Sequence, residues 1–111
     1  MMIGIDLVYI PEFEQRLNAT GSAEKIFLDS ELQAHITQES LAGVFAAKEA
    51  FFKAIGKKLD WKDVWVEREP GGRPILKSIH LREHMQAALT ISHSGEYAIA
   101  AVVIIEETQK R

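Results

Sequence analysis

The chain has 111 residues, a mass of 12.5 kDa and a formal net charge of −3. This length is typical of one domain, so we expect a single domain over residues 1–111. The acidic balance argues against a basic nucleic-acid-binding protein, and the absence of cysteine excludes disulfide scaffolds and thiolate chemistry. The longest apolar run, residues 97–105, is far shorter than the ~20 residues of a membrane helix. No basic stretch precedes an apolar segment at the N-terminus, so we expect a cytoplasmic protein outside the membrane.

The N-terminal third predicts a strand and two helices. Alternating apolar residues over 2–8 indicate an extended chain, with one side formed by Ile3, Ile5 and Leu7. Pro11 suits the first turn of a helix over residues 11–18. Ser30 opens a capping-box spacing, which predicts a short helix over residues 31–36.

The strongest helix signal covers residues 41–55. Apolar residues recur there at helical spacing and alanines fill much of the remaining surface, which allows close packing. Ser40 is the expected N-cap, and Gly56 is expected to end the helix.

The C-terminal half predicts mainly strands. We expect strands over residues 64–69, 75–77, 90–93 and 97–105, with a turn at 70–72 and a weak helix over 80–89. The last strand is almost wholly apolar and should lie inside a sheet or an interface. The predicted class is α+β, with an antiparallel sheet packed against one long helix and shorter helices.

Glu49 is an anomaly on the long helix, because its helical neighbours include Phe45 and Phe52. A carboxylate on such a stripe is costly if it is buried without compensation. One interpretation is an exposed ion pair with Lys53, which would contribute a few tenths of a kcal/mol. The alternative is a metal ligand or general base, with Lys53 beside an anionic substrate.

Two further polar features interrupt apolar strands. Asp6 could simply face solvent, but a second carboxylate such as Glu49 would let the pair hold Mg²⁺ together with substrate phosphates. Ser92, His93 and Ser94 stand between two apolar strands. A Ser–His–acid triad is disfavoured there, because adjacent residues on a strand point to opposite faces. A turn role or a hydrogen-bonding role remains open.

Several segments, in this order along the chain, resemble the 4′-phosphopantetheinyl transferases of the small holo-acyl-carrier-protein synthase type. Residues 3–8 (Ile-Gly-Ile-Asp-Leu-Val) are similar to the family's N-terminal Gly-x-Asp strand. Residues 45–56 (Phe-Ala-Ala-Lys-Glu-Ala-Phe-Phe-Lys-Ala-Ile-Gly) match its diagnostic helix. Residues 72–74 (Gly-Arg-Pro) fit its turn, and residues 91–94 (Ile-Ser-His-Ser) with 97–100 resemble its closing segment. The resemblance covers nearly the whole chain.

The resemblance implies transfer of phosphopantetheine from coenzyme A to a serine of an apo acyl carrier protein, with release of adenosine 3′,5′-bisphosphate. Asp6 and Glu49 would hold Mg²⁺ at the diphosphate of coenzyme A. Lys48 and Lys53 would contact phosphate oxygens or the leaving phosphate. Either Glu49 or water near the metal would accept the serine proton, and the sequence does not choose between them.

The resemblance also assigns the remaining parts of the site. Ser92 and His93 would line the nucleotide end of coenzyme A, and Gly72 and Pro74 would shape the adjoining turn. Small members of the family form homotrimers with active sites between protomers, and they serve fatty acid biosynthesis. We therefore expect a homotrimer.

Two positions depart from the family pattern. The family often has arginines where this chain has Ser40 and Val44, so some phosphate contacts are lost or are supplied elsewhere. This departure keeps open a non-catalytic scaffold that binds coenzyme A or a carrier protein. A third reading, an unrelated small α+β binding module, requires the motif matches to be accidental.

The first helix also departs from the family, in which it is basic and meets an acidic carrier. Here it contains Glu12, Glu14 and one cation, Arg16. We therefore expect weak electrostatic steering toward an acidic carrier, with either a less acidic native carrier or docking through apolar contacts from Phe13 and Leu17.

Overall fold

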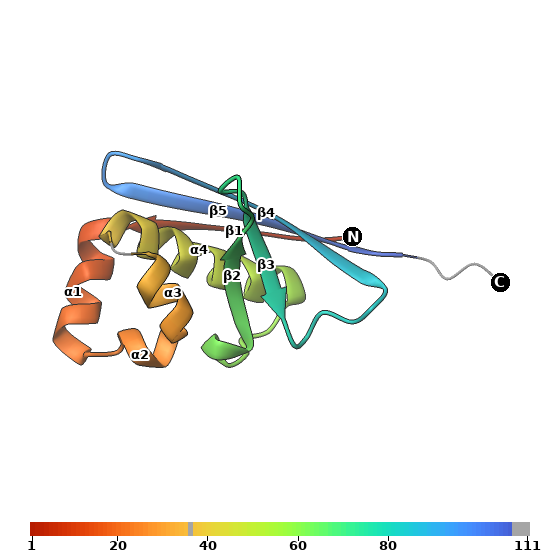
Figure 1. Ribbon diagram of the computed structural model, residues 1–111, viewed down its shortest axis with the longest axis horizontal. Helices are drawn as coiled ribbons and strands as arrows, with labels where there is room; N and C mark the ends of the chain where they lie inside the picture. The colour runs from red at the N-terminus through yellow and green to blue at the C-terminus, as the bar shows by residue number, and fades with distance from the viewer. Residues whose placement is uncertain (36, 108–111) are drawn as a thin grey trace.

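The expected long helix is α4, Gln38–Ile55, and the other elements pack around it (Figure 1). The computed structural model describes residues 1–35 and 37–107. In chain order the elements are β1 (Met2–Tyr9), α1 (Ile10–Thr20), α2 (Ala23–Ile26), α3 (Asp29–Ala34), α4, the 3₁₀ helix η1 (Trp61–Asp63), β2 (Val64–Arg68), β3 (Pro74–Ser78), β4 (Met85–Ser94) and β5 (Tyr97–Glu106). Within the described ranges, no helix is long and apolar enough to span a membrane.

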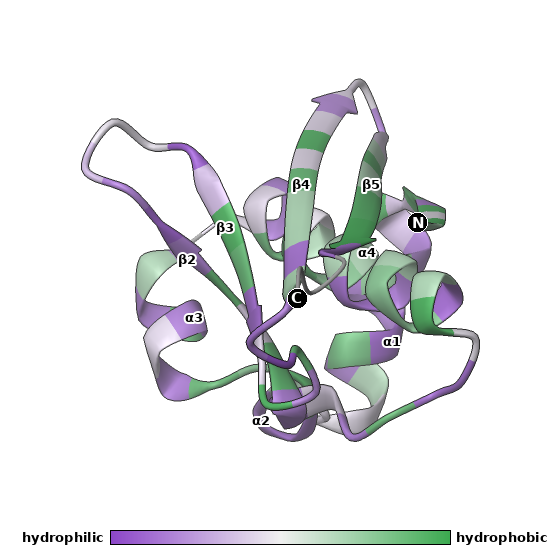
Figure 2. Cartoon of the chain, turned by 90° about the vertical axis from the view of Figure 1, so that its right-hand side faces the viewer, coloured by the Kyte–Doolittle hydropathy of each residue, from purple (hydrophilic) through white to green (hydrophobic). Residues whose placement is uncertain are grey.

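The strands form two antiparallel sheets, which confirms the predicted α+β class. One sheet has the order β1-β5-β4, and the other is the hairpin of β2 and β3. The apolar strand β5 lies in the middle of the larger sheet, as expected (Figure 2). Its buried side faces α4 through Ala98, Ala100, Val102 and Ile104.

The two sides of β1 have different surroundings. Ile3, Ile5 and Leu7 share one side, as predicted, but that side is exposed. Gly4, Asp6 and Val8 occupy the other side, which packs against α4. Asp6 therefore lies in the contact between strand and helix, and the solvent-facing interpretation of this residue is wrong.

The helix expected over residues 80–89 is wrong. Residues 85–89 begin strand β4, in which Met85 pairs with Glu106 and Leu89 pairs with Val102. An i, i+4 spacing of apolar residues fits one face of a strand as well as one face of a helix. Pairing with β5 stabilises the extended conformation. In that conformation alternate residues of β4 pack against the core while the others face solvent.

Several helix ends also differ from the prediction. The N-cap of α4 is Thr37, whose Oγ1 accepts a hydrogen bond from the Ser40 backbone N–H at 3.2 Å. Ser40 itself hydrogen-bonds to His35. The helix expected over 31–36 is α3, which begins at Asp29; Ile36 lies outside the described residues. The short helix α2 was not anticipated, whereas Gly56 ends α4 as predicted, with φ at 88°.

Candidate functional site

Asp6 and Lys53 meet where β1 crosses α4. The Lys53 Nζ lies 2.9 Å from the Asp6 Oδ1 and also donates to the Ile5 carbonyl oxygen at 3.0 Å. The Asp6 side chain is 14% exposed and the Lys53 side chain is 55% exposed. The ammonium is thus held beside the carboxylate, while the Lys53 side chain stays open to solvent and to an anion bound at Asp6.

Glu49 lies one helical turn before Lys53. Together with Asp6 it lines a cleft on the surface of the protein. Burial raises the pKa of the Glu49 carboxyl, and the negative charge of Asp6 raises it further. The cations of Lys58, Lys53 and Arg16 oppose this rise in pKa. Two carboxylates line one cleft, and three cations act on Glu49 electrostatically, which is a charge pattern suited to a phosphate-bearing ligand with a bound cation.

The cleft around the two carboxylates lies between β1, α1 and α4. Its volume is about 390 Å³, and its lining includes Asp6, Glu49, Arg16, Phe13 and Phe45. Val8, Tyr9, Glu12, Leu7 and Tyr97 complete that lining.

A second hollow adjoins this cleft, and we call it the aromatic groove. It has a volume of about 350 Å³ and is lined by Phe13, Arg16, Leu17, Thr20, Ser22, Ile26, Phe45, Glu49, Lys58 and Trp61. The rings of Phe45 and Trp61 stack at 5.2 Å between centroids, and Lys58 lies 5.0 Å over the Trp61 ring. Four residues, Phe13, Arg16, Phe45 and Glu49, line both hollows, so the groove extends the cleft.

The Asp6 and Glu49 pair fits a hard divalent cation. Both are oxygen donors that line one cleft, and the negative charge of Asp6 adds to the burial that raises the pKa of Glu49. Over residues 1–35 and 37–107, no group of three or more His, Asp or Glu residues could surround an ion. Mg²⁺ accepts such a partial protein shell, because it retains waters and takes further oxygens from substrate phosphates.

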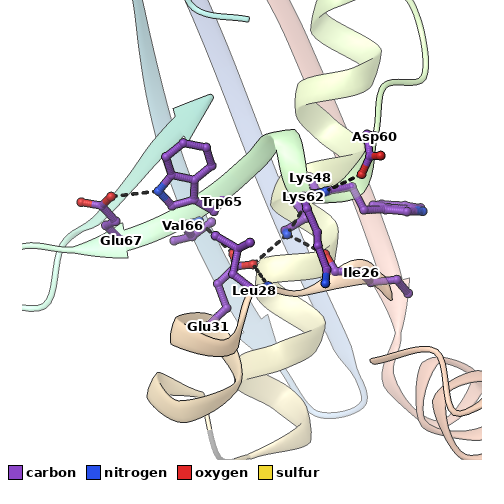
Figure 3. Close-up of polar contacts among 10 residues, drawn as sticks. Ile26, Leu28, Glu31, Lys48, Asp60, Lys62, Trp65, Val66 and Glu67 are labelled. Carbon is purple, nitrogen blue, oxygen red and sulfur yellow. Dashed lines mark hydrogen bonds and ion pairs between the residues drawn. The ribbon is translucent and has the colours of Figure 1, made fainter. Parts of the chain in front are cut away.

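Lys48 does not join this cleft (Figure 3). Its side chain is fully buried, and its Nζ lies 2.7 Å from the Oε1 of Glu31, which is equally buried. Burial lowers the pKa of Lys48, and the hydrogen bond and charge of Glu31 oppose that change. The structure therefore gives Lys48 a structural partner instead of the phosphate contact that the resemblance implied.

The other expected site residues lie apart from the carboxylate pair. Ser92 and His93 are exposed on β4, separated from β1 by the intervening strand β5. Gly72 and Pro74 lie at the end of the β2–β3 hairpin, which projects away from the larger sheet (Figure 2). None of these four residues lines the cleft. Within one chain, the structure brings together Asp6, Glu49 and Lys53 only.

Sequence reasoning missed three contributors to the site and its frame. Lys58 and Trp61 follow the long helix without any periodic pattern, so only the folded chain brings them beside Glu49. Glu31 is the buried partner of Lys48. Its Oε1 accepts the Leu28 backbone N–H at 3.0 Å, but leucine has no side-chain oxygen, so no capping-box signature in the sequence marks this position. Phe13 and Leu17 of α1 are buried in the core, so docking through these two side chains is wrong and the less acidic carrier remains the open alternative.

The raised pKa of Glu49 predicts a stability cost that depends on pH. The folded chain holds the Glu49 proton more tightly than the unfolded chain does. The free energy of unfolding therefore falls as pH rises from the ordinary glutamate range through the raised pKa. Above that pKa, Glu49→Gln should melt at a higher temperature than the parent in metal-free buffer, and the gap should shrink toward acidic pH. A gap that stays constant over the pH series would contradict this assignment.

Known proteins similar to this chain point to one family. Residues 2–102 match the model of the 4′-phosphopantetheinyl transferase superfamily. The holo-acyl-carrier-protein synthase of Nautilia profundicola is 38% identical, over 95% of this chain and 100% of that relative. The synthase of Nitratiruptor is also 38% identical, over 94% of this chain and 98% of the relative. The chain belongs to the 4′-phosphopantetheinyl transferase superfamily.

Solved structures agree with this assignment. The Helicobacter pylori holo-acyl-carrier-protein synthase, in complex with coenzyme A, superposes with a TM-score of 0.85 at 27% identity, covering 94% of this chain and 100% of that one. The complex of the Chronobacterium ammoniagenes enzyme with coenzyme A gives a TM-score of 0.83 at 31% identity, covering 96% and 98%. The match extends over almost the entire fold, so the unrelated binding module is excluded.

Proposed function

We propose that this chain is a holo-acyl-carrier-protein synthase, which transfers 4′-phosphopantetheine from coenzyme A to a serine of an apo acyl carrier protein. The observation that carries the proposal is that Asp6 and Glu49 line one cleft, with Lys53 paired to Asp6, in a chain from this family. Relatives of the same name cover nearly the whole chain, and two of the similar structures contain coenzyme A.

The reaction forms one bond and breaks another at the same phosphorus. The serine oxygen attacks the phosphorus that bears the pantetheine arm, and the bond from this phosphorus to the bridging oxygen of the diphosphate breaks. Adenosine 3′,5′-bisphosphate leaves with the bridging oxygen. The serine proton passes to Glu49 or to a water molecule. Lys53 is partly exposed and paired with Asp6, where its charge would offset the negative charge growing on the leaving phosphate.

Asp6 and Glu49 would hold Mg²⁺ in this enzyme. The ion supplies neutralisation of the diphosphate charge, which phosphoryl transfer requires more than covalent help. Lys53 lies on the Asp6 side of the pair, so the same carboxylate would orient both the ammonium and the ion.

Mass spectrometry of several apo carrier proteins, incubated with coenzyme A, Mg²⁺ and this protein, tests the proposal. A phosphopantetheine mass addition to one carrier would establish the activity. Coenzyme A binding without modification of any carrier would instead favour the scaffold, the alternative left open by Ser40 and Val44. An acidic and a less acidic carrier should both be included, since α1 presents Glu12 and Glu14.

We also propose that the chain forms a homotrimer through the outer face of the β1-β5-β4 sheet. Exposed apolar side chains crowd this face: Ile3, Ile5, Leu7, Tyr9, Tyr97, Ile99 and Ile105. Ile3, Ile5 and Leu7 are 68%, 57% and 61% exposed. A continuous apolar patch of this kind marks an interaction surface. A neighbouring copy could then bring Ser92 and His93 to the cleft, which they do not line within one chain.

Ile5→Glu should disrupt this assembly and lower activity with it. A charge at the centre of an apolar interface must be desolvated without a partner, which disfavours association. Light scattering after gel filtration should give a monomer mass for the variant and a trimer mass for the parent. Ile79→Glu is the matched control, because Ile79 is 67% exposed but lies outside the sheet. A parent that is monomeric at working concentration would contradict the trimer.

Subunit mixing tests whether the site is shared between copies. Asp6→Asn and His93→Ala subunits, co-expressed, should form some sites that draw an intact residue from each copy and thus regain activity. Activity no higher than that of the separate variants would show that Asp6 and His93 do not come from different copies in one site.

A further inference from the structure

The ammonium of Lys48 contacts three segments outside α4, namely α2, α3 and η1 (Figure 3). Besides the Glu31 carboxylate, it donates to the Ile26 carbonyl oxygen at 2.7 Å and to the Trp61 carbonyl oxygen at 3.1 Å. Its three protons thus have three acceptors, one at the end of α2, one on α3 and one on η1. A buried lysine with this complete set of partners fixes the segments that hold those acceptors.

The partner carboxylate extends the network to two more backbone groups. The Oε1 of Glu31 accepts the Leu28 N–H at 3.0 Å, and its Oε2 accepts the Val66 N–H at 2.9 Å. The pair therefore links α4 with the connection between α1 and α3 and with strand β2.

Two of the three acceptors belong to walls of the aromatic groove. Ile26 and Trp61 both line it, and Glu49, the neighbour of Lys48 in sequence, lines it as well. The helices α2 and η1 have only four and three residues. Helices this short do not hold their position without tertiary contacts. The Lys48 ammonium supplies such a contact for both walls at once.

We propose that Lys48 is a positioning residue, which holds the Ile26 and Trp61 walls of the aromatic groove at the spacing that binds coenzyme A. The inference rests on the proposed function. The groove continues the carboxylate cleft through Glu49, so a long substrate whose diphosphate lies at Glu49 extends into it. Arg16 and Lys58 line the groove and provide positive charge for an anionic ligand.

The test uses the double variant Lys48→Met/Glu31→Gln. The single change would leave the Glu31 carboxylate buried without its cation, which commonly prevents folding. The double variant removes both charges but still deprives Ile26 and Trp61 of their donor. We expect coenzyme A to bind about tenfold more weakly in calorimetry and its KM to rise by about the same factor, with kcat and the KM for the carrier nearly unchanged. Lys62→Met, an exposed change in η1, is the matched control.

Tryptophan fluorescence reports directly on the Trp61 wall of the aromatic groove. The chain has two tryptophans, so in a Trp65→Phe background the emission reports on Trp61 alone. Acrylamide should quench Trp61 more efficiently in the double variant than in the Lys62→Met control, because the freed wall admits the quencher.

Three outcomes would decide against parts of this assignment. Unchanged coenzyme A affinity and unchanged quenching in a folded, active double variant would overturn the role of Lys48. A rise in the carrier KM alone would overturn coenzyme A as the occupant of the groove. A parent protein that neither binds coenzyme A nor modifies any carrier would overturn the proposed function, whereas the first two outcomes leave that function standing.

Discussion

Replacing Asp6 with Asn, or Glu49 with Gln, is expected to reduce turnover by about 100-fold or more while leaving the fold intact. Each change removes one negative oxygen ligand and keeps the shape of the side chain. Folding should survive because the Asp6 pair involves a lysine that is 55% exposed, and such a pair contributes under about 1 kcal/mol. The measurement is the rate of carrier modification at saturating coenzyme A, followed over a range of Mg²⁺ concentrations.

A binding readout separates loss of the metal from loss of another function. Mg²⁺ should raise the melting temperature of the parent protein, because a ligand that binds only the folded state stabilises it. The same addition should have little effect on the Asp6→Asn and Glu49→Gln variants. Full activity of both variants at limiting Mg²⁺ would show that the carboxylates do not hold the ion.

Gly4→Ala should be the most destabilising single-methyl change in β1. A Cβ atom at Gly4 would lie 1.9 Å from the Ala50 carbonyl oxygen and 2.7 Å from the Ala54 nitrogen, both of which are backbone atoms of α4. The helix must then move away from the strand. We expect a loss of about 3 kcal/mol or more, equivalent to a fall in melting temperature of about 12 °C or more. Chemical denaturation monitored by circular dichroism would measure it.

The matched controls are other glycines. An added Cβ at Gly71 meets no atom within 4 Å, and this glycine has no positive φ, so Gly71→Ala should be neutral or slightly stabilising. At Gly43 the nearest atom is the Cγ2 of Ile91 at 2.8 Å, a side-chain atom that can shift, so an intermediate loss is expected. Equal stability of the Gly4 and Gly71 variants would show that close contact between β1 and α4 is not required.

Local sequence patterns correctly predicted the helices and strands that are determined by residues close together in the chain. The α4 helix has apolar residues at helical spacing and a glycine in the left-handed region at its end, and both act within a few residues. The strand β4 was misread because its apolar residues fit either structure, and pairing with β5 settled the choice. The resemblance added the pairing of Asp6 with the helix, which no local pattern contains.

The role of Lys48 illustrates what the sequence could not provide. Lys48 and Glu49 are adjacent, and both are charged residues on a largely apolar helix, so the sequence alone gives no reason to expect different environments for their side chains. Successive residues of an α-helix point about 100° apart around the helix axis, so Glu49 faces the cleft while Lys48 faces the core. The burial of Lys48 depends on Glu31, seventeen residues earlier, and on two backbone oxygens whose position is set by the whole fold.

The two-sided character of β1 constrains how this strand can change in evolution. Side chains alternate between the helix-facing and outward-facing sides, so inserting or deleting one residue after Gly4 would exchange the two sets downstream. Asp6 would turn outward among the isoleucines, and an isoleucine or leucine would enter the carboxylate cleft. Substitutions in β1 can be tested one face at a time, whereas a single-residue change in its length would disturb the carboxylate cleft and the proposed assembly surface together. We therefore expect β1 to keep a fixed length among active relatives even where its apolar residues vary.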